Sequence, residues 1–387
     1  MKVVLIYHGG VTPYTRSLYR AIAAREGVDR LTVIVPERVQ SERVYSPSGW
    51  LTAAAADAED GYELIPIPLN DPTEYGRGFD RALLQATLKQ ANADVIQVLD
   101  EPFSGYLRQV LAVAALTSRR SKIVFYGFEN RPLRFTRQAH AMWKTLAWPR
   151  TAGGAAANSE ALANLIKAGY PRRKPLERIF WGIPTELFAE PGHVSPSELR
   201  VDGGAKLVGY VGRLVPDKGL FVLAAAMLRL PAEVNCVMIG SGPMRGELEL
   251  FSSLPELRGR IHFRNALEPE DLARAIRSFD VLTLPSLTMP RWKEQYGRVL
   301  GEGMAAGVPV VGSDSGAIPE VIADAGIVVR ESDPEALAEA LHTAIFDDST
   351  RSRLIESGKR RAEDELSTPV MAGRLVSLYE RVLTSAC

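Results

Sequence analysis

Short apolar runs alternate along the first half of this chain with segments in which apolar residues recur every three or four positions. The runs are typical of buried strands, and the periodic segments are typical of helices. Such alternation predicts right-handed crossovers and a parallel sheet. The predicted strands span residues 2–7, 30–35, 62–66, 94–99, 122–127 and 155–158, and the predicted helices span 13–24, 72–91, 105–117, 135–146 and 159–168.

The alternation pauses at residues 191–204, PGHVSPSELRVDGG, where proline, glycine and serine are frequent and no periodicity is present. Such a segment is typical of a linker between domains. The second half then repeats the alternation. Its predicted strands span residues 206–212, 234–240, 260–264, 280–284, 308–313 and 327–329, and its helices span 220–230, 244–253, 269–278, 334–346, 349–363 and 369–384.

The pattern therefore predicts an α/β protein with two parallel-sheet, Rossmann-like domains at residues 1–190 and 205–367. The last helix follows after the second sheet is complete, so we expect residues 368–387 to return to the first domain. A chain of 387 residues with 46% hydrophobic and 24% charged residues has the length and composition for two such cores.

The apolar runs and the cysteine content of the chain indicate its cellular compartment. No apolar run approaches the roughly 18 residues of a membrane span, and the start of the chain lacks a signal-peptide pattern, so we expect a cytoplasmic protein. The 2 cysteines offer neither a disulfide framework nor metal-ligand spacing. Net charge is zero, and we expect no nucleic-acid partner.

Charge is unevenly divided between the halves. Residues 1–190 hold 24 Lys and Arg against 19 Asp and Glu, and the second half is correspondingly acidic. Residues 130–150 contain five cations, no acidic residue and two tryptophans, Trp143 and Trp148. This stretch could bind an anionic acceptor or make peripheral contact with a membrane. It could equally be a solvated basic helix whose tryptophans lie in the core.

Loops after the strands carry the candidate chemistry of the first domain, because ligands of parallel sheets bind beyond the carboxyl ends of strands. His8 and a glycine pair follow the first strand, where two glycines alone could also mark only a tight turn. Asp100 and Glu101 are adjacent carboxylates suited to accept a hydrogen bond from a sugar hydroxyl or to act as a base. They could instead cap the helix that begins near Gly105.

The second domain offers a clearer anion site. Arg213 and Lys218 flank the loop RLVPDKG before a helix, an arrangement suited to a diphosphate, although Asp217 could make it a capped surface turn. A polar loop containing Glu294 leads into a helix whose first amides are unpaired. Trp292 in that loop could shape a pocket or only pack beneath it. Ala266 and Leu267 follow a strand and could present backbone groups to a nucleobase edge.

These segments resemble a known family. GRLVPDKG at residues 212–219, the sequence EQYGRVLGEGMAAGVPVVGSDSG from Glu294, and NSE at residues 158–160 are similar to motifs of retaining glycosyltransferases of family 4. The resemblance covers nearly the whole chain and is strongest over the second domain. It implies the GT-B fold, in which two Rossmann-like domains face a central cleft, the second domain binds a nucleotide-sugar and the C-terminal helix crosses back to the first.

The resemblance also implies roles for residues. Arg213 and Lys218 would neutralise the donor diphosphate, Glu302 would accept hydrogen bonds from ribose hydroxyls, and Glu294 would hold hydroxyls of the donor sugar. The expected donor-binding set is Gly9, Gly10, Arg213, Lys218, Ala266, Leu267, Glu294, Gln295, Tyr296, Gly297, Val299 and Glu302. The catalytic candidates are Glu294, Arg213, Lys218, Asp100 and Asn130. The acceptor-binding candidates are His8, Asp100, Glu101, Glu129, Asn130 and Arg131.

One departure from the family pattern concerns the first-domain loop FENRPLR, where many members carry a histidine and this chain has Glu129 and Asn130. A second is WGIPTELF, in which Pro184 replaces a common aspartate. The acceptor is open, because acceptor loops are where such folds diversify, and it could be a small molecule, a glycan or a lipid-linked sugar.

The resulting hypothesis is a retaining transferase that moves a hexosyl unit from a nucleotide-sugar, with UDP the expected nucleotide, to an acceptor hydroxyl. No cofactor and no metal are expected, because arginine, lysine and helix-end amides can supply the positive charge and no Asp-x-Asp pair is present near the motifs. The alternatives are a GT-B phosphorylase, a sugar-nucleotide hydrolase or epimerase, and a non-catalytic sugar-nucleotide binder. A nicotinamide-dependent oxidoreductase is disfavoured because no G-x-G-x-x-G motif opens a helix after a strand.

Overall fold

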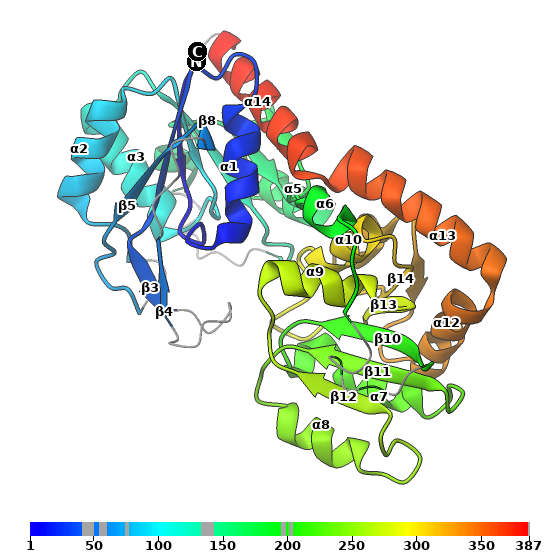
Figure 1. The fold of residues 1–387 in the computed structure, drawn as a ribbon. Coiled ribbons are helices and arrows are strands. Elements are labelled where there is room, and N and C mark those ends of the chain that lie inside the picture. The colour runs from blue at the N-terminus through cyan, green and yellow to red at the C-terminus, as the bar shows by residue number, and fades with distance from the viewer. Residues whose placement is uncertain are drawn as a thin grey trace. The chain divides into compact units, whose positions relative to one another are not determined.

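The structure is a computed structural model that describes residues 1–40, 50–53, 60–73, 77–132, 143–194, 199, 201 and 204–385 (Figure 1). The chain divides into two compact units. Unit 1 comprises Met1–Gly182 and Thr368–Cys387, and unit 2 comprises Ile183–Ser367. Each unit has its own parallel sheet, which confirms the predicted α/β class.

Unit 1 contains a seven-stranded parallel sheet in the order β5-β2-β1-β6-β7-β8-β9. Its strands are β1 Lys2–Ile6, β2 Arg30–Pro36, β5 Glu63–Ile67, β6 Val95–Val98, β7 Lys122–Gly127, β8 Thr151–Ala156 and β9 Leu176–Arg178. A separate antiparallel pair joins β3 Arg38–Gln40 to β4 Trp50–Thr52. The central strands are apolar on both faces, as expected for a parallel sheet covered by helices.

Helices cover both faces of this sheet. On one side α1 and α14 lie against each other, and on the other side α2 and α3 pack over the main apolar core (Figure 1). The helical segments are η1 Pro13–Thr15, α1 Arg16–Ala23, α2 Arg81–Ala91, α3 Gly105–Thr117, the π-helical turn η3 Trp143–Ala147, α5 Ser159–Lys167 and α14 Thr368–Thr384. The C-terminal helix therefore belongs to unit 1.

Two predictions in unit 1 need correction. The helix expected at residues 72–91 begins only at Arg81, because Asp80 caps it by accepting from the Leu83 amide at 2.8 Å, and Phe79 pairs with Leu69. The strand expected at residues 155–158 is β8, which starts four positions earlier at Thr151 and includes a glycine pair. A Cβ on Gly154 would lie 2.2 Å from the Phe125 ring, so a bulky neighbour explains the glycine within this strand.

The basic stretch at residues 130–150 is only partly described. The helix predicted at residues 135–146 lies mostly outside the described residues, which resume at Trp143. Trp143 and Trp148 are buried and contact the Phe103 ring edge-on. Both tryptophans are therefore core residues, as one of the two alternatives predicts.

Unit 2 contains a six-stranded parallel sheet in the order β12-β11-β10-β13-β14-β15. Its strands are β10 Lys206–Val211, β11 Val234–Ile239, β12 Ile261–Arg264, β13 Val281–Leu284, β14 Val310–Ser313 and β15 Ile327–Val329. The helical segments are α6 Thr185–Ala189, η4 Pro216–Lys218, α7 Leu220–Met227, α8 Arg245–Ser252, α9 Pro269–Arg277, α10 Arg298–Ala305, α11 Ile318–Ile322, α12 Pro334–Phe346, α13 Asp348–Arg361 and η5 Ala362–Leu366.

The boundary between the units differs from the predicted one at residue 190. The Ile183 amide donates to the Leu366 carbonyl at 2.8 Å, and α6 packs on α9 and α10, so residues 183–190 belong to unit 2. The first residues of the predicted linker also attach to this unit, since the Val194 amide donates to Ser278 Oγ at 3.0 Å. Residues 195–198, 200 and 202–203 of that linker lie outside the described residues.

Strand order identifies one special position in each sheet. In unit 1 the chain runs outward from β1 through β2 to β5 and then returns to β6 on the other side of β1. In unit 2 it runs outward from β10 to β12 and returns to β13. Loops after β1 and β6, and after β10 and β13, therefore diverge at topological switch points, where open α/β sheets bind ligands.

Candidate functional site

The loop after β10 carries both predicted cations of unit 2. Tyr210 Oη donates to the Arg213 carbonyl at 2.7 Å, and the Arg213 side chain is exposed. Lys218 ends η4, and Gly219 follows it with a left-handed φ of +67°. A Cβ on Gly219 would lie 1.9 Å from the Pro285 carbonyl oxygen. Glycine is therefore required for this loop to approach the end of β13.

Lys218 and Glu294 form an ion pair across the switch point of unit 2. Lys218 Nζ lies 2.5 Å from Glu294 Oε2, and the two side chains are only 13% and 9% exposed. Ser286 Oγ donates to the same carboxylate oxygen at 2.9 Å. The Lys218 ammonium also lies 4.5 Å from the centre of the Trp292 ring, which provides a cation–π contact. A cation and a carboxylate are thus held side by side by residues from two loops.

Buried serines join the ends of β13 and β14 behind this pair. Ser313 Oγ donates to the Ser286 carbonyl at 2.5 Å, and the hydroxyls of Thr288 and Ser315 lie 3.1 Å apart. Ser286 was not among the predicted site residues. Its position could have indicated a role, because Ser286 lies two residues after the strand ending at Leu284 and a buried serine there needs a hydrogen-bond partner.

The backbone of Glu294 is fixed by the turn after β14. Its carbonyl oxygen accepts from the Ala317 amide at 2.9 Å. Gly316 precedes that amide with φ +57°, and a Cβ there would lie 2.0 Å from the same carbonyl oxygen. The second glycine-rich turn therefore positions Glu294 through close backbone contact.

The helix that follows Glu294 is α10, and Gly297 caps its start with φ +78° and no side-chain cap. Tyr296 and Val299 are buried and Gln295 is half-buried, so these residues offer backbone more than side-chain atoms. Glu302 is 2% exposed, and Arg298 Nε lies 3.0 Å from its Oε1. The structure thus holds Glu302 in a pair on α10, separate from the Lys218–Glu294 pair.

Ala266 and Leu267 lie farther along the sheet. They follow β12, the edge strand two positions from β10, and both are half-buried. In the described part of the chain, neither forms a hydrogen bond with the loops after β10 and β13. Their predicted contact with a nucleobase stays a prediction.

In unit 1 the predicted residues gather after β1, β6 and β7, which are neighbours in the sheet. His8 Nδ1 lies 3.6 Å from Asp100 Oδ2, and the His8 ring stacks on Tyr106. Gly9 and Gly10 follow directly. A Cβ on Gly10 would lie 2.1 Å from Tyr19 Oη, so this glycine has a packing reason independent of any ligand.

Glu101 ties the loop after β6 to the loop after β7. Its Oε1 accepts hydrogen bonds from the amides of Phe128 and Glu129, at 2.5 and 2.9 Å. Asn130 is buried beside them, and Arg131 pairs with Glu129. Asn158 caps α5 and also donates to the Phe128 carbonyl at 3.2 Å. The loop that departs from the family pattern is therefore held by internal bonds.

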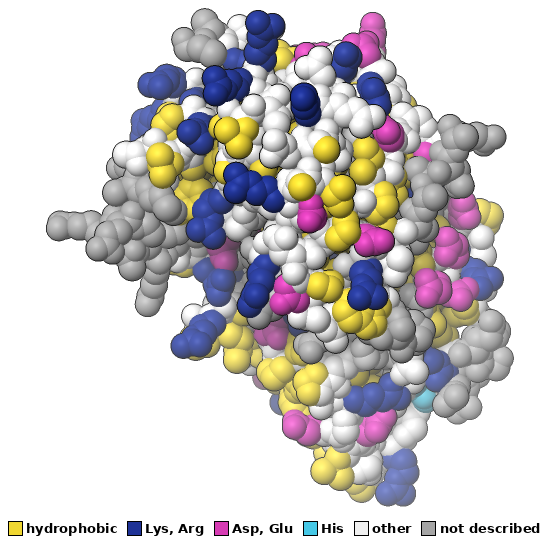
Figure 2. Space-filling view, turned by 90° about the vertical axis from the view of Figure 1, so that its left-hand side faces the viewer, with side chains coloured by type: hydrophobic (Ala, Val, Ile, Leu, Met, Phe, Trp, Pro, Cys, Tyr) yellow, Lys and Arg dark blue, Asp and Glu magenta, His cyan; other side chains and the backbone are white. Residues whose placement is uncertain are grey.

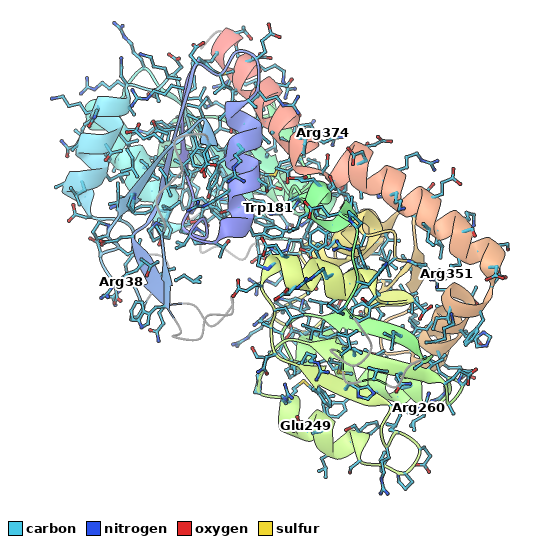
Figure 3. All side chains as sticks on the ribbon, viewed as in Figure 1. Arg38, Trp181, Glu249, Arg260, Arg351 and Arg374 are labelled. Carbon is cyan, nitrogen blue, oxygen red and sulfur yellow. The ribbon has the colours of Figure 1, made fainter. Side chains whose placement is uncertain are left out.

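A cluster of aromatic side chains packs next to the same loops. The Trp181 ring, labelled in Figure 3, lies 5.4 Å from Tyr7, 5.7 Å from Tyr126 and 5.4 Å from Phe128. Each of these partners stands at or just past the end of β1 or β7. Trp181 thus packs against the strand ends that carry the candidate residues of unit 1.

The pKa of Glu101 is raised from 4.5 to about 7, mainly by burial and also by the neighbouring charges of Asp100 and Glu129, while the two amide hydrogen bonds act in the opposite direction. The folded protein therefore binds more protons than the unfolded chain between these pH values, so stability falls as pH rises through this range. We expect this carboxyl alone to lower the free energy of unfolding by about 3 kcal/mol as the pH rises from 4.5 to 7. Glu101→Gln keeps an oxygen for both amides and should flatten the pH dependence.

Urea unfolding of the wild type and Glu101→Gln at pH 5 and pH 8 measures this effect. Glu26→Gln, which changes an exposed glutamate of the same unit, is the matched control and should follow the wild type. Equal pH dependence in the wild type and Glu101→Gln would contradict the assignment.

Two searches of the described residues were negative. No group of three His, Cys, Asp or Glu side chains there is arranged to hold a metal ion. Within the same described ranges, no helix combines the length and the apolar character needed to cross a membrane.

Solved structures of low identity share this architecture. The chain superimposes on Alr3699/HepE of Anabaena in complex with UDP with a TM-score of 0.70, at 19% identity over 98% of this chain and 100% of that one. A glycosyltransferase from Rickettsia africae gives a TM-score of 0.75, at 15% identity over 99% of both chains. These likenesses confirm the expected GT-B class of fold, with two Rossmann-like units.

Sequence similarity is concentrated in part of the chain. A D-inositol 3-phosphate glycosyltransferase of Corynebacterium efficiens is 34% identical over 204 residues, which are 50% of this chain and 47% of the relative. The chain spans about half the length of the first curated relatives it matches. Residues 195–361 match the family model for glycosyl transferases group 1, which includes both loops of the Lys218–Glu294 pair. The match to this family therefore lies within unit 2.

Proposed function

We propose that the chain is a retaining glycosyltransferase of family 4 that moves a hexosyl unit from a UDP-sugar to an acceptor hydroxyl without a metal. The observation that carries the proposal is the Lys218–Glu294 pair at the switch point of unit 2. Its two charges suit the two parts of a nucleotide-sugar. An ammonium complements a diphosphate, and a carboxylate can accept hydrogen bonds from two sugar hydroxyls.

The chemistry follows from where charge develops. As the bond between the sugar and the diphosphate breaks, negative charge grows on the departing UDP. Lys218 and the exposed Arg213 would stabilise that charge, and the positive end of the α10 helix dipole would add to it. Glu294, anchored through its backbone by Ala317, would orient the sugar during transfer. Retention of configuration and independence of metal are parts of the proposal that rest on the family resemblance.

The similar proteins support the choice of donor. The Anabaena structure is described as a complex with UDP, and a second structure of that protein as a complex with UDP and glucose. We therefore take UDP as the first nucleotide to test. The acceptor is left as a hydroxyl compound that would be recognised by the loops after β1, β6 and β7 of unit 1.

Binding of UDP should raise the melting temperature of the protein by several degrees. A ligand that binds only the native state stabilises it by about 2.7 kcal/mol at 100 times its Kd. Thermal-shift titration with UDP, GDP, ADP and uridine measures the preference. We expect UDP to stabilise most and uridine, which lacks the diphosphate, to stabilise little. No stabilisation by any nucleoside diphosphate would contradict the proposed donor site.

A further inference from the structure

A cavity lies within unit 1, at the opposite end of its sheet from the predicted site residues. It has a volume of about 790 Å³ and is bordered by the start of β7 at Lys122, the start of β8 at Thr151, and α14 at Val382 and Ser385. The candidate residues follow the other ends of these strands. Since β7 has 6 residues, the two ends are roughly 16 Å apart. The cavity is therefore distinct from the proposed catalytic region.

Positive charge dominates the rim of this cavity. Six cationic side chains line it and no Asp or Glu does: Arg119, Arg120, Lys122, Arg150, Arg173 and Lys174. They come from the first residue of β7 and from three separate loops, after α3, after η3 and before β9. Figure 2 shows Lys and Arg side chains gathered on the upper left of the molecule in that view, with few acidic side chains among them.

Much of this charge is not neutralised by carboxylates. Among the described residues, no ion pair joins Arg119, Arg120, Arg150 or Arg173 to an acidic side chain. Lys174 Nζ donates to the carbonyls of Trp148, Pro149 and Thr151, at 2.7, 3.1 and 2.5 Å. These three carbonyls fix the ammonium at the rim of the cavity.

The floor of the cavity is apolar, with Leu111, Ala114, Ile123 and Val382 contributing to it. A concave site of this volume, with an apolar floor and a rim of one charge, has the form of a small-molecule site. Like charges brought together in this way repel one another, and a bound polyanion would remove that repulsion. Arginine forks also match phosphate oxygens in geometry.

We propose that this cavity is a second binding site of the chain, for a ligand that carries at least two phosphate charges on a non-ionic body. Bound there, the ligand would link α14 to the loops before β7, β8 and β9. The shared chemistry is a phosphate or diphosphate group. It can come from a soluble phosphorylated compound or from the headgroup of an anionic lipid, and the test separates these two sources.

Inorganic pyrophosphate is the probe, measured by calorimetric titration of the full chain. The variant Arg120→Ala/Arg173→Ala should weaken binding at the cavity at least tenfold. The matched control, Arg172→Ala/Arg229→Ala, removes two exposed arginines that do not line the cavity and should change binding less than twofold. Arg150→Glu provides an independent variant with a reversed charge at the rim and should also weaken binding at least tenfold. Melting temperatures near that of the wild type establish that the variants fold.

Pyrophosphate can also bind at Lys218, so Lys218→Ala is titrated in parallel. Binding that persists in Lys218→Ala and is lost in the cavity variants supports the second site. Binding that is lost in Lys218→Ala and unchanged in the cavity variants would overturn it. The result is independent of the proposed function, which fails instead if UDP gives no stabilisation in any form of the chain.

Cosedimentation with phosphatidylcholine vesicles containing phosphatidate identifies the source of the phosphate. Vesicle binding that the cavity variants abolish assigns the site to a lipid headgroup. Pyrophosphate binding without vesicle binding assigns it to a soluble ligand, and both outcomes support the site. Unchanged pyrophosphate and vesicle binding in the cavity variants would contradict it.

Discussion

Lys218→Ala should lower the rate of glycosyl transfer by about 100- to 1000-fold, the range found when one preorganised donor to a developing negative charge is removed. Two of its contacts matter. The ammonium lies 2.5 Å from Glu294 and over the Trp292 ring, so it is held in one place before the reaction. A charge that needs no reorganisation contributes most where water is largely excluded, and the side chain is 13% exposed.

The variant also has a structural cost. Removing one partner of a largely buried ion pair leaves the other charge uncompensated and destabilises a protein by about 3–5 kcal/mol. Glu294 would then retain the hydrogen bond from the Ser286 hydroxyl. Loss of activity and loss of stability must therefore be separated.

The double variant Lys218→Met/Glu294→Gln makes this separation. It removes both charges and keeps similar side-chain volumes, so it should recover most of the lost stability without recovering transfer. Urea unfolding and UDP release from a UDP-sugar in the presence of an acceptor measure the two properties. Lys206→Ala is the control, because it breaks another lysine pair of unit 2, with Asp280, at the start of β10. Normal turnover in Lys218→Ala would refute the assigned role.

The sequence predicted the strands and helices of each unit, but it did not predict the order of strands within the sheets. Alternation of apolar runs and helical periods located every strand of unit 2, because parallel strands buried on both faces are continuous in sequence. Strand β8 was placed four positions late, since Gly153 and Gly154 do not form an apolar run. Their small size is explained only by Phe125 and Val382, which are distant in sequence.

For the candidate site, the sequence likewise predicted individual residues but not the contacts between them. Arg213, Lys218 and Glu294 were selected as candidates because charged residues after strand ends are visible in one sequence. Their arrangement was not. The direct pairing of Lys218 with Glu294, and the donation from Ser286 to the same oxygen, depend on loops that join only through strand order. Likewise, Glu101 was expected near an acceptor, and its bonds to two amides indicate that it also orders the loop after β7.

Glycines were the least specific signal in the sequence, and the structure separates those with a function in the backbone from the others. Gly316 has φ +57°, and its ideal Cβ would lie 2.0 Å from the Glu294 carbonyl oxygen. Gly246 lies in α8, and its ideal Cβ meets no atom within 4 Å. The two positions therefore provide a matched pair for the same substitution.

Gly316→Ala should destabilise unit 2 by about 2–4 kcal/mol, since the new methyl group requires backbone strain and displacement of the Glu294 carbonyl. Gly246→Ala should stabilise it by up to about 1 kcal/mol, because alanine is favoured within a helix. Denaturant unfolding measures both changes. UDP-sugar binding should also weaken at least tenfold in Gly316→Ala at a temperature where the variant is folded, because the turn positions Glu294 through its backbone. If Gly316→Ala matched Gly246→Ala in stability and in binding, the turn would have no part in holding that carboxylate.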